Sequence, residues 1–478
     1  MTKQILILLT SILVISCQTN EKKSVEKEKI NLNGNWEYLG FGKAIVIGDS
    51  IVQSYHTSTV GNVQTSDNPS TDFFNYYTVD TLSNDTILLK DGVKTFKLFR
   101  STKDFGKMLK DQLANDPKYN FEVLWNTFNE QYVYFKERNV DWNKMYEKYE
   151  PQINSETKPL ELYLIFERML REINDSHVSI ELPESLEKEY NSIEGKVSPK
   201  NTDVTGEFKK EVRNKIVQRY LKDPKKFNKG SITYGKISDH IGYLAIQNMV
   251  TMAYYSDIPD SLSTDDFNNR LINTTFSQKN EHDEVRKGTR FMMDSIINYL
   301  GSVKAFIIDL RFNGGGFDDA SVEILNHFVS EKIDFATKKV RLGDGFTEKQ
   351  IMSLYPSKKT FTGKVYVLTS KQTASAAEVL VLGAKKLPNS KSIGYTTEGV
   401  FSDILRKKLP NGWTYGLSNM IYQSMDGVSY EEIGITPDYK IEYPVKSKDF
   451  YEYLFKDLED GDDAIEMVIE KTRTIRKD

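Results

Sequence analysis

A serine stands where a predicted buried strand turns into a predicted helix. Residues 364–368 form a short apolar run rich in β-branched residues, which is typical of a buried strand. After a polar turn, small and apolar residues recur at helical spacing over 374–384. Ser375 therefore lies beside backbone N–H groups that have no partner inside the helix, as a nucleophile requires for the oxyanion it creates. The simpler interpretation is that Thr373 or Ser375 only caps the helix.

Three successive glycines follow a second buried strand. The strand is predicted over 305–310, and Gly314, Gly315 and Gly316 come shortly after it. Glycines accept positive φ and let the backbone approach a ligand, and their N–H groups can form an anion-binding nest. Their spacing does not fit the Gly-x-Gly-x-x-Gly dinucleotide fingerprint. They indicate either an oxyanion-binding turn or a plain tight turn.

A histidine and two adjacent carboxylates complete the set of candidate residues. His177 follows Ser176 directly after a predicted helix, at the start of an alternating strand, where it could act as a general base. Glu431 and Glu432 lie in an acidic turn just before a Gly-Ile-Thr-Pro-Asp corner at 434–438. Considered singly, a lone histidine is more often structural and an acidic turn is more often only solvated.

The elements that must position these residues fall into successive blocks. Short β runs separated by Gly, Asn and Asp turns predict a small all-β barrel or sandwich, and helical periodicity follows it. The last third alternates as βαβαβ, which predicts an α/β fold whose sheet has helical crossovers. The expected organisation is a signal peptide at 1–17, a flexible linker at 18–30, the small β domain at 31–100, a helical cap at 105–187 carrying Ser176 and His177, a helical or irregular insert at 188–231, an α/β core at 232–447, and a helical tail at 448–478.

The N-terminus predicts export and a lipid anchor. Lys3 precedes an apolar run over 5–15 that is too short to span a bilayer and has the shape of a signal peptide. Cys17, the single cysteine of the chain, stands where bacterial lipoprotein signals place the acylated residue. We expect a lipid-anchored protein of the cell envelope, periplasmic or surface-exposed; the alternative is a plain secretory signal with a chance cysteine.

Composition excludes several classes of partner. The chain has 478 residues, a net charge of −4 and no basic block in its globular part, so nucleic acid is not an expected partner. With one cysteine, no internal disulfide can form. No cofactor and no metal site are expected.

Together, and in this order, the motifs resemble the C-terminal processing (tail-specific) serine peptidase family. The matching features are Asp-Leu-Arg-x-Asn-Gly-Gly-Gly at a strand end, Thr-Ala-Ser-Ala-x-Glu at the serine turn, and the Gly-Ile-x-Pro-Asp corner. The resemblance covers about residues 105–445. It implies a crotonase/ClpP-like α/β catalytic core and hydrolysis of peptide bonds in proteins or peptides.

One branch of that family uses a Ser–Lys dyad, and this chain departs from it. Val400 occupies the place of the lysine and cannot accept a proton, while Lys407 and Lys408 are out of register. The sequence is more similar to the branch that includes the Tricorn core protease, which uses serine, histidine and glutamate with a second serine before the histidine.

That similarity implies a role for each candidate. Ser375 attacks the carbonyl carbon, His177 takes its proton, and Glu431 acts through Ser176 or a water molecule, with Glu432 as the alternative carboxylate. The residues whose N–H groups are implied to hold the oxyanion are Ala376, Gly315 and Gly316.

The chain also lacks room for a PDZ domain, which many family members carry, because only about 190–230 is free. Substrate tails would then be gathered elsewhere, for which the β domain is a candidate. Two other functions stay open on the sequence alone. One is an inactive peptide- or lipid-binding protein on the same fold, and the other is a crotonase-like acyl-CoA enzyme.

Overall fold

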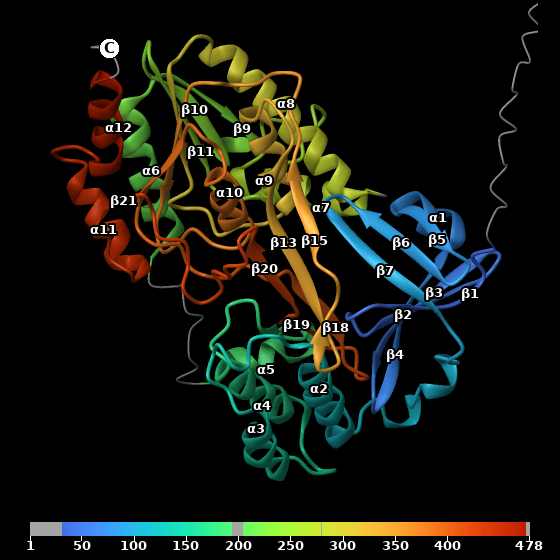
Figure 1. Ribbon diagram of the computed structural model, residues 1–478. Coiled ribbons are helices and arrows are strands. Elements are labelled where there is room, and N and C mark those ends of the chain that lie inside the picture. Colours follow the sequence, from blue (N-terminus) through green and yellow to red (C-terminus); the bar gives the residue numbers. More distant parts are fainter. Residues whose placement is uncertain (1–30, 194–203, 279, 475–478) are drawn as a thin grey trace, which may run out of the picture.

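The computed structural model describes residues 31–193, 204–278 and 280–474 (Figure 1). The predicted signal peptide, Cys17 and the linker lie outside this part of the chain. Within it, none of the helices combines the length and apolar character needed to cross a bilayer.

The N-terminal β domain is one antiparallel seven-stranded sheet, with strand order β4-β3-β2-β1-β7-β6-β5. Its elements are β1 (Gly34–Tyr38), β2 (Lys43–Ile47), β3 (Ile51–Ser58), β4 (Gly61–Pro69), α1 (Ser70–Tyr76), β5 (Thr78–Ser83), β6 (Thr86–Asp91) and β7 (Lys94–Ser101). In the described chain β4 and β5 remain edge strands, so the sheet is open where a barrel or sandwich was predicted. The helix α1 was not predicted; it begins after Pro69, and its aromatic rings Phe73 and Phe74 pack edge to face with centroids 5.4 Å apart.

The helical cap consists of three helices and a short strand. They are α2 (Pro117–Gln131), α3 (Trp142–Tyr149), α4 (Pro159–Arg171) and β8 (Ser179–Ile180), with single turns at Gly106–Met108, Asp111–Leu113, Glu150–Gln152 and Glu184–Leu186. The side chains of Asp116 and Asp141 cap α2 and α3. Phe121 and Phe128 of α2 and Phe166 of α4 are buried, as their helical spacing predicts.

The α/β core is built on a second seven-stranded sheet, with order β21-β17-β16-β12-β11-β10-β9. Its strands are β9 (Lys222–Phe227), β10 (Ile232–Ser238), β11 (Ile241–Ile246), β12 (Ala305–Asp309), β16 (Lys364–Thr369), β17 (Ser390–Gly394) and β21 (Tyr439–Lys440). The five strands from β11 to β21 are parallel, and β10 and β9 are antiparallel. The strand β9 belongs to this sheet, although it was predicted within the insert.

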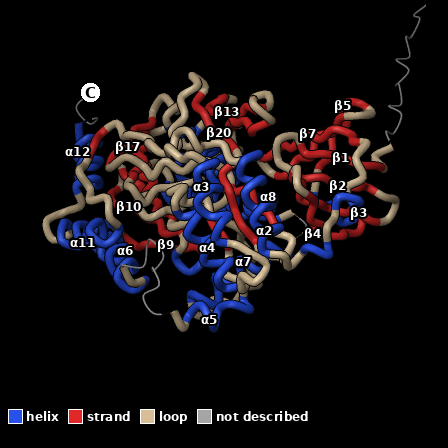
Figure 2. The backbone as a smooth tube through the Cα atoms, turned by 90° about the horizontal axis from the view of Figure 1, so that it is seen from below, coloured by secondary structure: helices blue, strands red, loops and turns tan. Residues whose placement is uncertain are grey.

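Helices cover both faces of the core sheet, so its central strands are buried on both sides. One face carries α8 (Glu281–Leu300), α9 (Asp318–Leu325) and α10 (Ala376–Ala384), and the other carries α6 (Gly206–Tyr220), α11 (Ser447–Asp457) and α12 (Asp463–Thr474) (Figures 1 and 2). Alternate residues of β12 show this division, since Phe306 and Ile308 join one apolar cluster and Ala305 and Ile307 join the other. This arrangement confirms the predicted α/β core. The remaining helices are α5 (Glu187–Asn191) and α7 (Thr264–Ser277), with further single turns at Asn228–Gly230 and Asn326–Phe328.

Two smaller sheets connect the cap to the core. One comprises β13 (Ile333–Leu342), β14 (Gly345–Phe346), β15 (Gln350–Leu354) and β20 (Met420–Ser424), and the other comprises β18 (Ile404–Lys408), β19 (Thr414–Ser418) and β8. The sequence predicts a hairpin with arms at 405–409 and 414–422 around the turn at 410–412. It is present as β18 and β19, but its second arm divides at Asn419, and β20 pairs with β13. Because Ile180 of β8 lies opposite Tyr415 of β19, the segment with Ser176 and His177 is carried onto the core.

Candidate active site

Ser375 sits in a strained turn between β16 and α10. Its φ of 55° lies in the left-handed region, which residues other than glycine seldom adopt. Strain of this kind persists only where the surroundings enforce it, and it is concentrated at functional sites. The residue directly precedes α10, so the first N–H groups of that helix lie beside its side chain.

The serine turn is fastened to the end of β12. The Thr373 hydroxyl donates to the Leu310 carbonyl at 2.8 Å, and the Ala374 N–H donates to the Asn313 carbonyl at 3.1 Å. A Cβ added to Gly315 would lie 2.6 Å from the Cβ of Ser375. The strand end and the serine turn are therefore in van der Waals contact, and only glycine fits at position 315.

The three implied oxyanion donors differ in their present partners. The N–H of Gly315 donates to the Asn313 side-chain oxygen at 2.8 Å, so it is already engaged. Within the described residues, the N–H groups of Ala376 and Gly316 have no acceptor. These two groups are the ones available to a developing oxyanion.

A buried carboxylate inside α10 holds the neighbouring loop against the serine turn. Glu378 accepts the N–H groups of Gly399 and Val400, each at 2.8 Å, and that of Ser375 at 3.2 Å. Burial raises the pKa of Glu378 to about 8, against the hydrogen bonds it accepts. In the sequence, Glu378 is the last residue of the Thr-Ala-Ser-Ala-x-Glu motif, and no role was predicted for it.

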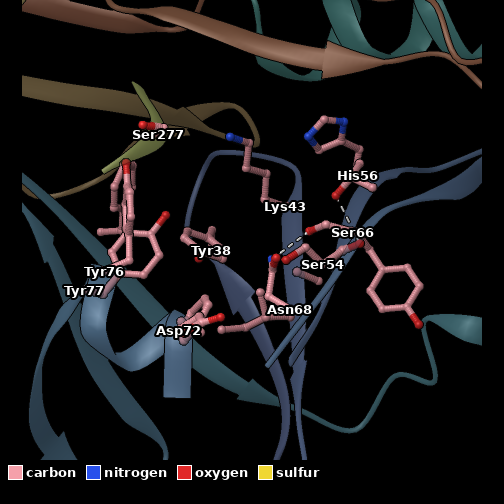
Figure 3. Close-up of a pocket in the computed structure, with 16 residues that line it drawn as sticks. Tyr38, Lys43, Ser54, His56, Ser66, Asn68, Asp72, Tyr76, Tyr77 and Ser277 are labelled. Carbon is pink, nitrogen blue, oxygen red and sulfur yellow. Dashed lines mark hydrogen bonds between the residues drawn. The ribbon is translucent and has the colours of Figure 1, made fainter. Parts of the chain in front are cut away.

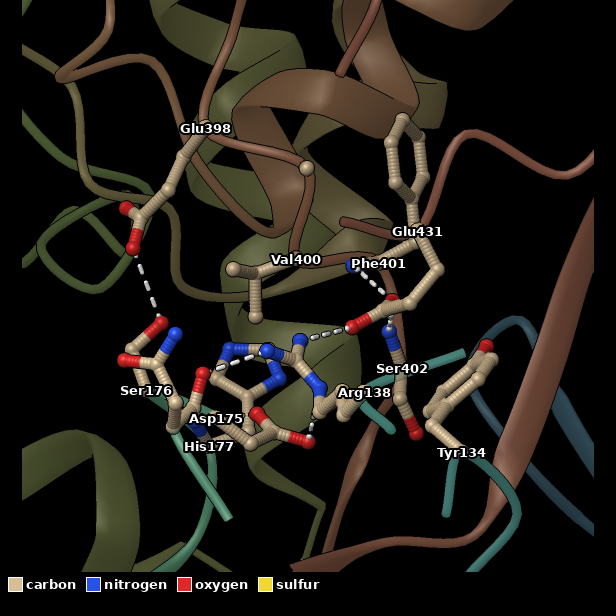
Figure 4. Close-up of polar contacts among 12 residues, drawn as sticks. Tyr134, Arg138, Asp175, Ser176, His177, Glu398, Val400, Phe401, Ser402 and Glu431 are labelled. Carbon is tan, nitrogen blue, oxygen red and sulfur yellow. Dashed lines mark hydrogen bonds and ion pairs between the residues drawn. The ribbon is translucent and has the colours of Figure 1, made fainter. Parts of the chain in front are cut away.

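The cap reaches the site through Ser176 and His177. The Ser176 hydroxyl donates to Glu398 Oε1 at 2.8 Å, and the Glu398 N–H donates to the Thr373 carbonyl at 2.9 Å (Figure 4). The segment carrying the histidine is therefore tied to the serine turn through Glu398. Sequence reasoning missed Glu398, which lies only two residues before Val400.

The imidazole of His177 is buried, which favours its neutral form. Its backbone N–H donates to Asp175 Oδ1 at 2.9 Å, while its ring Nδ1 is buried without a partner. Burial lowers the pKa of His177, opposed by the nearby Asp175 carboxylate. Within the described part of the chain no hydrogen bond joins this ring to the Ser375 hydroxyl.

Glu431 lies in a buried ion cluster beside the histidine. Its Oε1 is 2.8 Å from Arg138 Nη2 and its Oε2 accepts the Phe401 N–H at 2.8 Å, while Arg138 Nε lies 3.4 Å from Asp175 Oδ2 (Figure 4). Burial, together with the Asp175 carboxylate, raises the pKa of Glu431 to about 7. Glu431 is thus connected to the histidine segment through Arg138 and Asp175. Glu431 was expected to act through Ser176, but Ser176 bonds to Glu398 instead. Glu432 is exposed.

The lysines do not restore a Ser–Lys pair. Val400 is buried at the position of the family lysine. Lys407 donates to the Gly42 carbonyl of the β domain, and the backbone N–H of Lys408 donates to a β3 side chain, so both belong to another interface. Lys371 donates to the Glu398 carbonyl at 2.9 Å and supports the loop rather than the nucleophile.

Two families match separate parts of this architecture. Residues 240–441 match peptidase family S41, and residues 113–171 match the Tricorn protease C1 domain. The first range contains Ser375 and most of the core sheet, and the second covers α2 to α4 of the cap.

Individual relatives are similar over about a third of the chain. The carboxy-terminal processing protease CtpA of Bacillus subtilis (strain 168) is 29% identical over 159 residues, which are 33% of this chain and 33% of CtpA. The Tricorn protease of Thermoplasma acidophilum is 28% identical over 174 residues, which are 36% of this chain and 15% of Tricorn. The chain therefore spans a third or less of the length of these two relatives.

One solved structure shows the same fold over a larger part. A crystal structure from Parabacteroides merdae ATCC 43184 covers 75% of this chain and 96% of its own, with a TM-score of 0.53 and 23% identity. Its likeness concerns the fold alone. On these matches, the α/β core is similar to peptidase family S41, and the helical cap is similar to the Tricorn protease C1 domain.

Proposed function

We propose that this protein is a serine endopeptidase that cleaves proteins or peptides through an acyl-enzyme on Ser375. The observation that carries the proposal is the strained Ser375 turn, which is packed against Gly315 and has the free N–H of Ala376 beside it. The similarity to S41 peptidases and to a carboxy-terminal processing protease supports the same reaction.

In the acylation step, the Ser375 oxygen bonds to the carbonyl carbon of the scissile peptide and its proton passes to His177. The carbonyl oxygen becomes an oxyanion held by the N–H groups of Ala376 and Gly316. When the C–N bond breaks, His177 returns the proton to the departing amine. In deacylation, His177 takes a proton from water, the resulting hydroxide equivalent attacks the ester, and the serine hydroxyl is restored.

The proton transfer requires His177 to come within hydrogen-bond reach of Ser375 when substrate binds. Catalytic hydrogen bonds are often absent or long before substrate arrives and tighten in the complex. The Ser176–Glu398 bond is suited to guide this approach, because it links the histidine segment to the loop that Glu378 fixes beside the serine.

The buried cluster of Arg138, Asp175 and Glu431 is proposed as a positioning device. Asp175 accepts the backbone N–H of His177, and Arg138 joins Asp175 to Glu431. In this assignment Glu431 and Ser176 act on the histidine through other groups and do not touch the substrate.

We further propose that Cys17 is acylated and anchors the protein to a membrane of the cell envelope. Lipidation would make the mature protein peripheral, since an acyl chain rather than a helix would hold it. Replacement of Cys17 by Ser is expected to move the protein from the membrane fraction to the soluble fraction. An unchanged distribution would overturn the anchor.

Hydrolysis of casein by the purified protein tests the catalytic proposal. We expect cleavage by the wild type and a loss of at least about 1,000-fold in Ser375→Ala, as in other serine nucleophile deletions. Ser390→Ala, which alters a serine at the start of the neighbouring strand β17, should retain wild-type activity. Equal hydrolysis by wild type and Ser375→Ala would refute Ser375 as the nucleophile.

A further inference from the structure

A cavity of about 590 Å³ lies in the β domain and borders the end of α7. Side chains from β2, β3, β4 and α1 line it, together with Ser277 from the core (Figure 3). It shares no residue with the site around Ser375. Its volume falls in the range of pockets that hold small organic ligands.

The cavity contains a lysine without a counter-ion. Lys43 extends into it, and within the described residues its ammonium has neither an ion pair nor a hydrogen bond (Figure 3). Burial, helped by the nearby Lys94, lowers the pKa of Lys43 to about 8, so the group stays mostly protonated at pH 7. Lys43 is half-buried, and a partly buried, unpaired charge is unfavourable, so a bound anion would relieve that cost.

A histidine supplies a second donor on the same side of the cavity. His56 Nδ1 accepts the backbone N–H of Lys408 at 2.8 Å. Burial, with the charges of Lys407, Lys43 and Lys408, holds the pKa of His56 well below its usual range. The ring is therefore neutral with its proton on Nε2, which makes it a donor and not an added charge.

The rest of the wall is a mixture of aromatic and polar side chains, with the polar ones including Ser54, Ser66 and Asn68. The rings of Tyr38 and Phe96 pack edge to face with their centroids 5.7 Å apart. The ring centroids of Phe73 and Tyr77 are 5.0 Å apart. One carboxylate, Asp72, also lines the cavity, and in Figure 3 it lies at the opposite end from the Lys43 ammonium. The cavity thus has one cation and one neutral donor at one end, a carboxylate at the other, and both aromatic and polar side chains between them.

The Lys43 end, together with the aromatic part of the wall, fits a singly charged anion attached to an aromatic body. One ammonium balances one negative charge, so a carboxylate is matched where a phosphate dianion would remain undercompensated. We propose that the cavity binds a monocarboxylate on an apolar or aromatic body, with the carboxylate on Lys43 and His56. Such a group occurs at the C-terminus of a peptide and in a free organic acid, and both carry the same recognition chemistry.

Calorimetric titration of the full chain carrying Ser375→Ala tests the proposal without interference from turnover. The probes are N-acetyl-Ala-Phe with a free carboxylate, the same peptide as its C-terminal amide, and 3-phenylpropionate. We expect at least one of the two acids to bind and the amide to bind at least tenfold more weakly than its acid. Binding by the peptide acid alone would identify a peptide C-terminus, and binding by 3-phenylpropionate would identify a free organic acid.

Lys43→Met keeps the apolar stem and removes the charge, and Lys90→Met is the control in the same sheet outside the cavity. Lys43→Met should weaken acid binding about 10- to 100-fold, the usual size for loss of a charged hydrogen bond, while Lys90→Met binds as the parent. Thermal melting of Lys43→Met should show an unchanged or raised Tm, because removing an unpaired, half-buried charge does not harm the fold. The proposal is overturned if neither acid binds at millimolar concentration, or if amidation or Lys43→Met leaves binding unchanged. Since hydrolysis plays no part in these titrations, they can fail while the peptidase proposal stands.

Discussion

Burial shifts the pKa values of several ionisable residues around Ser375. His177 is kept neutral by burial, and Glu431 and Glu378 are pushed toward their protonated forms by the same cause. Catalytic groups are commonly tuned in this way, because the base must be unprotonated at the working pH. Two predictions follow from these shifts.

The first concerns activity against pH. Because the pKa of His177 is lowered from 6.5, the base should be fully available at pH 7 and should be lost only at lower pH. We expect kcat/KM for a peptide substrate to rise with pH and to reach half its plateau below pH 6.5. A half-maximal value above pH 7 would contradict the neutral, buried histidine.

The second concerns stability. The folded-state pKa of Glu378 is raised from 4.5 to about 8. Its contribution to the free energy of unfolding is therefore fully present below pH 4.5 and is lost as pH rises through 8. Glu378→Gln cannot ionise, and its free energy of unfolding in urea should therefore fall less than that of the wild type between pH 5 and pH 9. Parallel pH profiles of the two proteins would show that Glu378 does not titrate in this window.

A third residue-scale prediction tests the buried ion cluster. Arg138→Met leaves Glu431 and Asp175 without their shared cation, which should cost about 3–5 kcal/mol in the free energy of unfolding. The control is Arg406→Met, whose ion pair with Glu181 is exposed and should be worth about 0–1 kcal/mol. If the two variants lose equal free energy of unfolding, the buried cluster stabilises the fold no more than an exposed ion pair does.

At the scale of elements, the predictable parts were those with a continuous apolar run or a strong helical period. The apolar run 241–246 predicts a strand with the bounds that β11 has, and β12 matches its prediction to within one residue, because a strand covered on both faces is apolar throughout. The strand β13 was missed, since its sequence Ile-Asp-Phe-Ala-Thr-Lys-Lys-Val-Arg-Leu mixes charge with apolar residues and depends on pairing with β15 and β20.

The same distinction explains what was found of the candidate site. Ser375 and Gly315 stand in local motifs at strand ends, and the sequence placed them together correctly. Glu398 and Arg138 have no local signal, because their roles arise from contacts across 222 and 293 positions of sequence. The hydrogen bond between Ser176 and Glu398 likewise depends on the tertiary fold, and no sequence spacing indicates it.

Two neighbouring glycines provide a matched test of the serine turn. Gly315 has a φ of 99° and no room for a Cβ beside Ser375, whereas an added Cβ on Gly314 would meet nothing within 4 Å. Gly315→Ala should lower kcat by at least about 100-fold, because a displacement of about 1 Å at the reacting groups is enough to do so. Gly314→Ala should stay within a few-fold of the wild type. Comparable activity in both variants would separate the glycine turn from catalysis.

At the scale of the whole molecule, the β domain is joined to the rest by a common core and by buried polar pairs. Trp36 of β1 belongs to the same apolar cluster as the cap and one face of the core sheet. His282 of α8 contacts Asp319 at 2.6 Å and Asp91 of the β domain at 3.4 Å. The β pattern that stops near residue 101 predicts a unit separable from the rest of the chain, but these contacts indicate a docked domain.

Thermal unfolding tests this docking. We expect one cooperative transition of the full chain, with sheet and helix signals in circular dichroism lost together, since no separate core would survive in the β domain. Two resolved transitions, the first confined to sheet signal, would instead show that the β domain unfolds by itself.

Covalent labelling can show whether Ser375 is a nucleophile activated by His177. A fluorophosphonate probe reacts only with an activated serine, and intact-mass measurement followed by peptide mapping locates the adduct. We predict a single adduct on Ser375 in the wild type, none in Ser375→Ala, and labelling slowed at least about 100-fold in His177→Ala. Labelling at another serine would contradict Ser375 as the nucleophile, and an unchanged rate in His177→Ala would contradict its activation by His177.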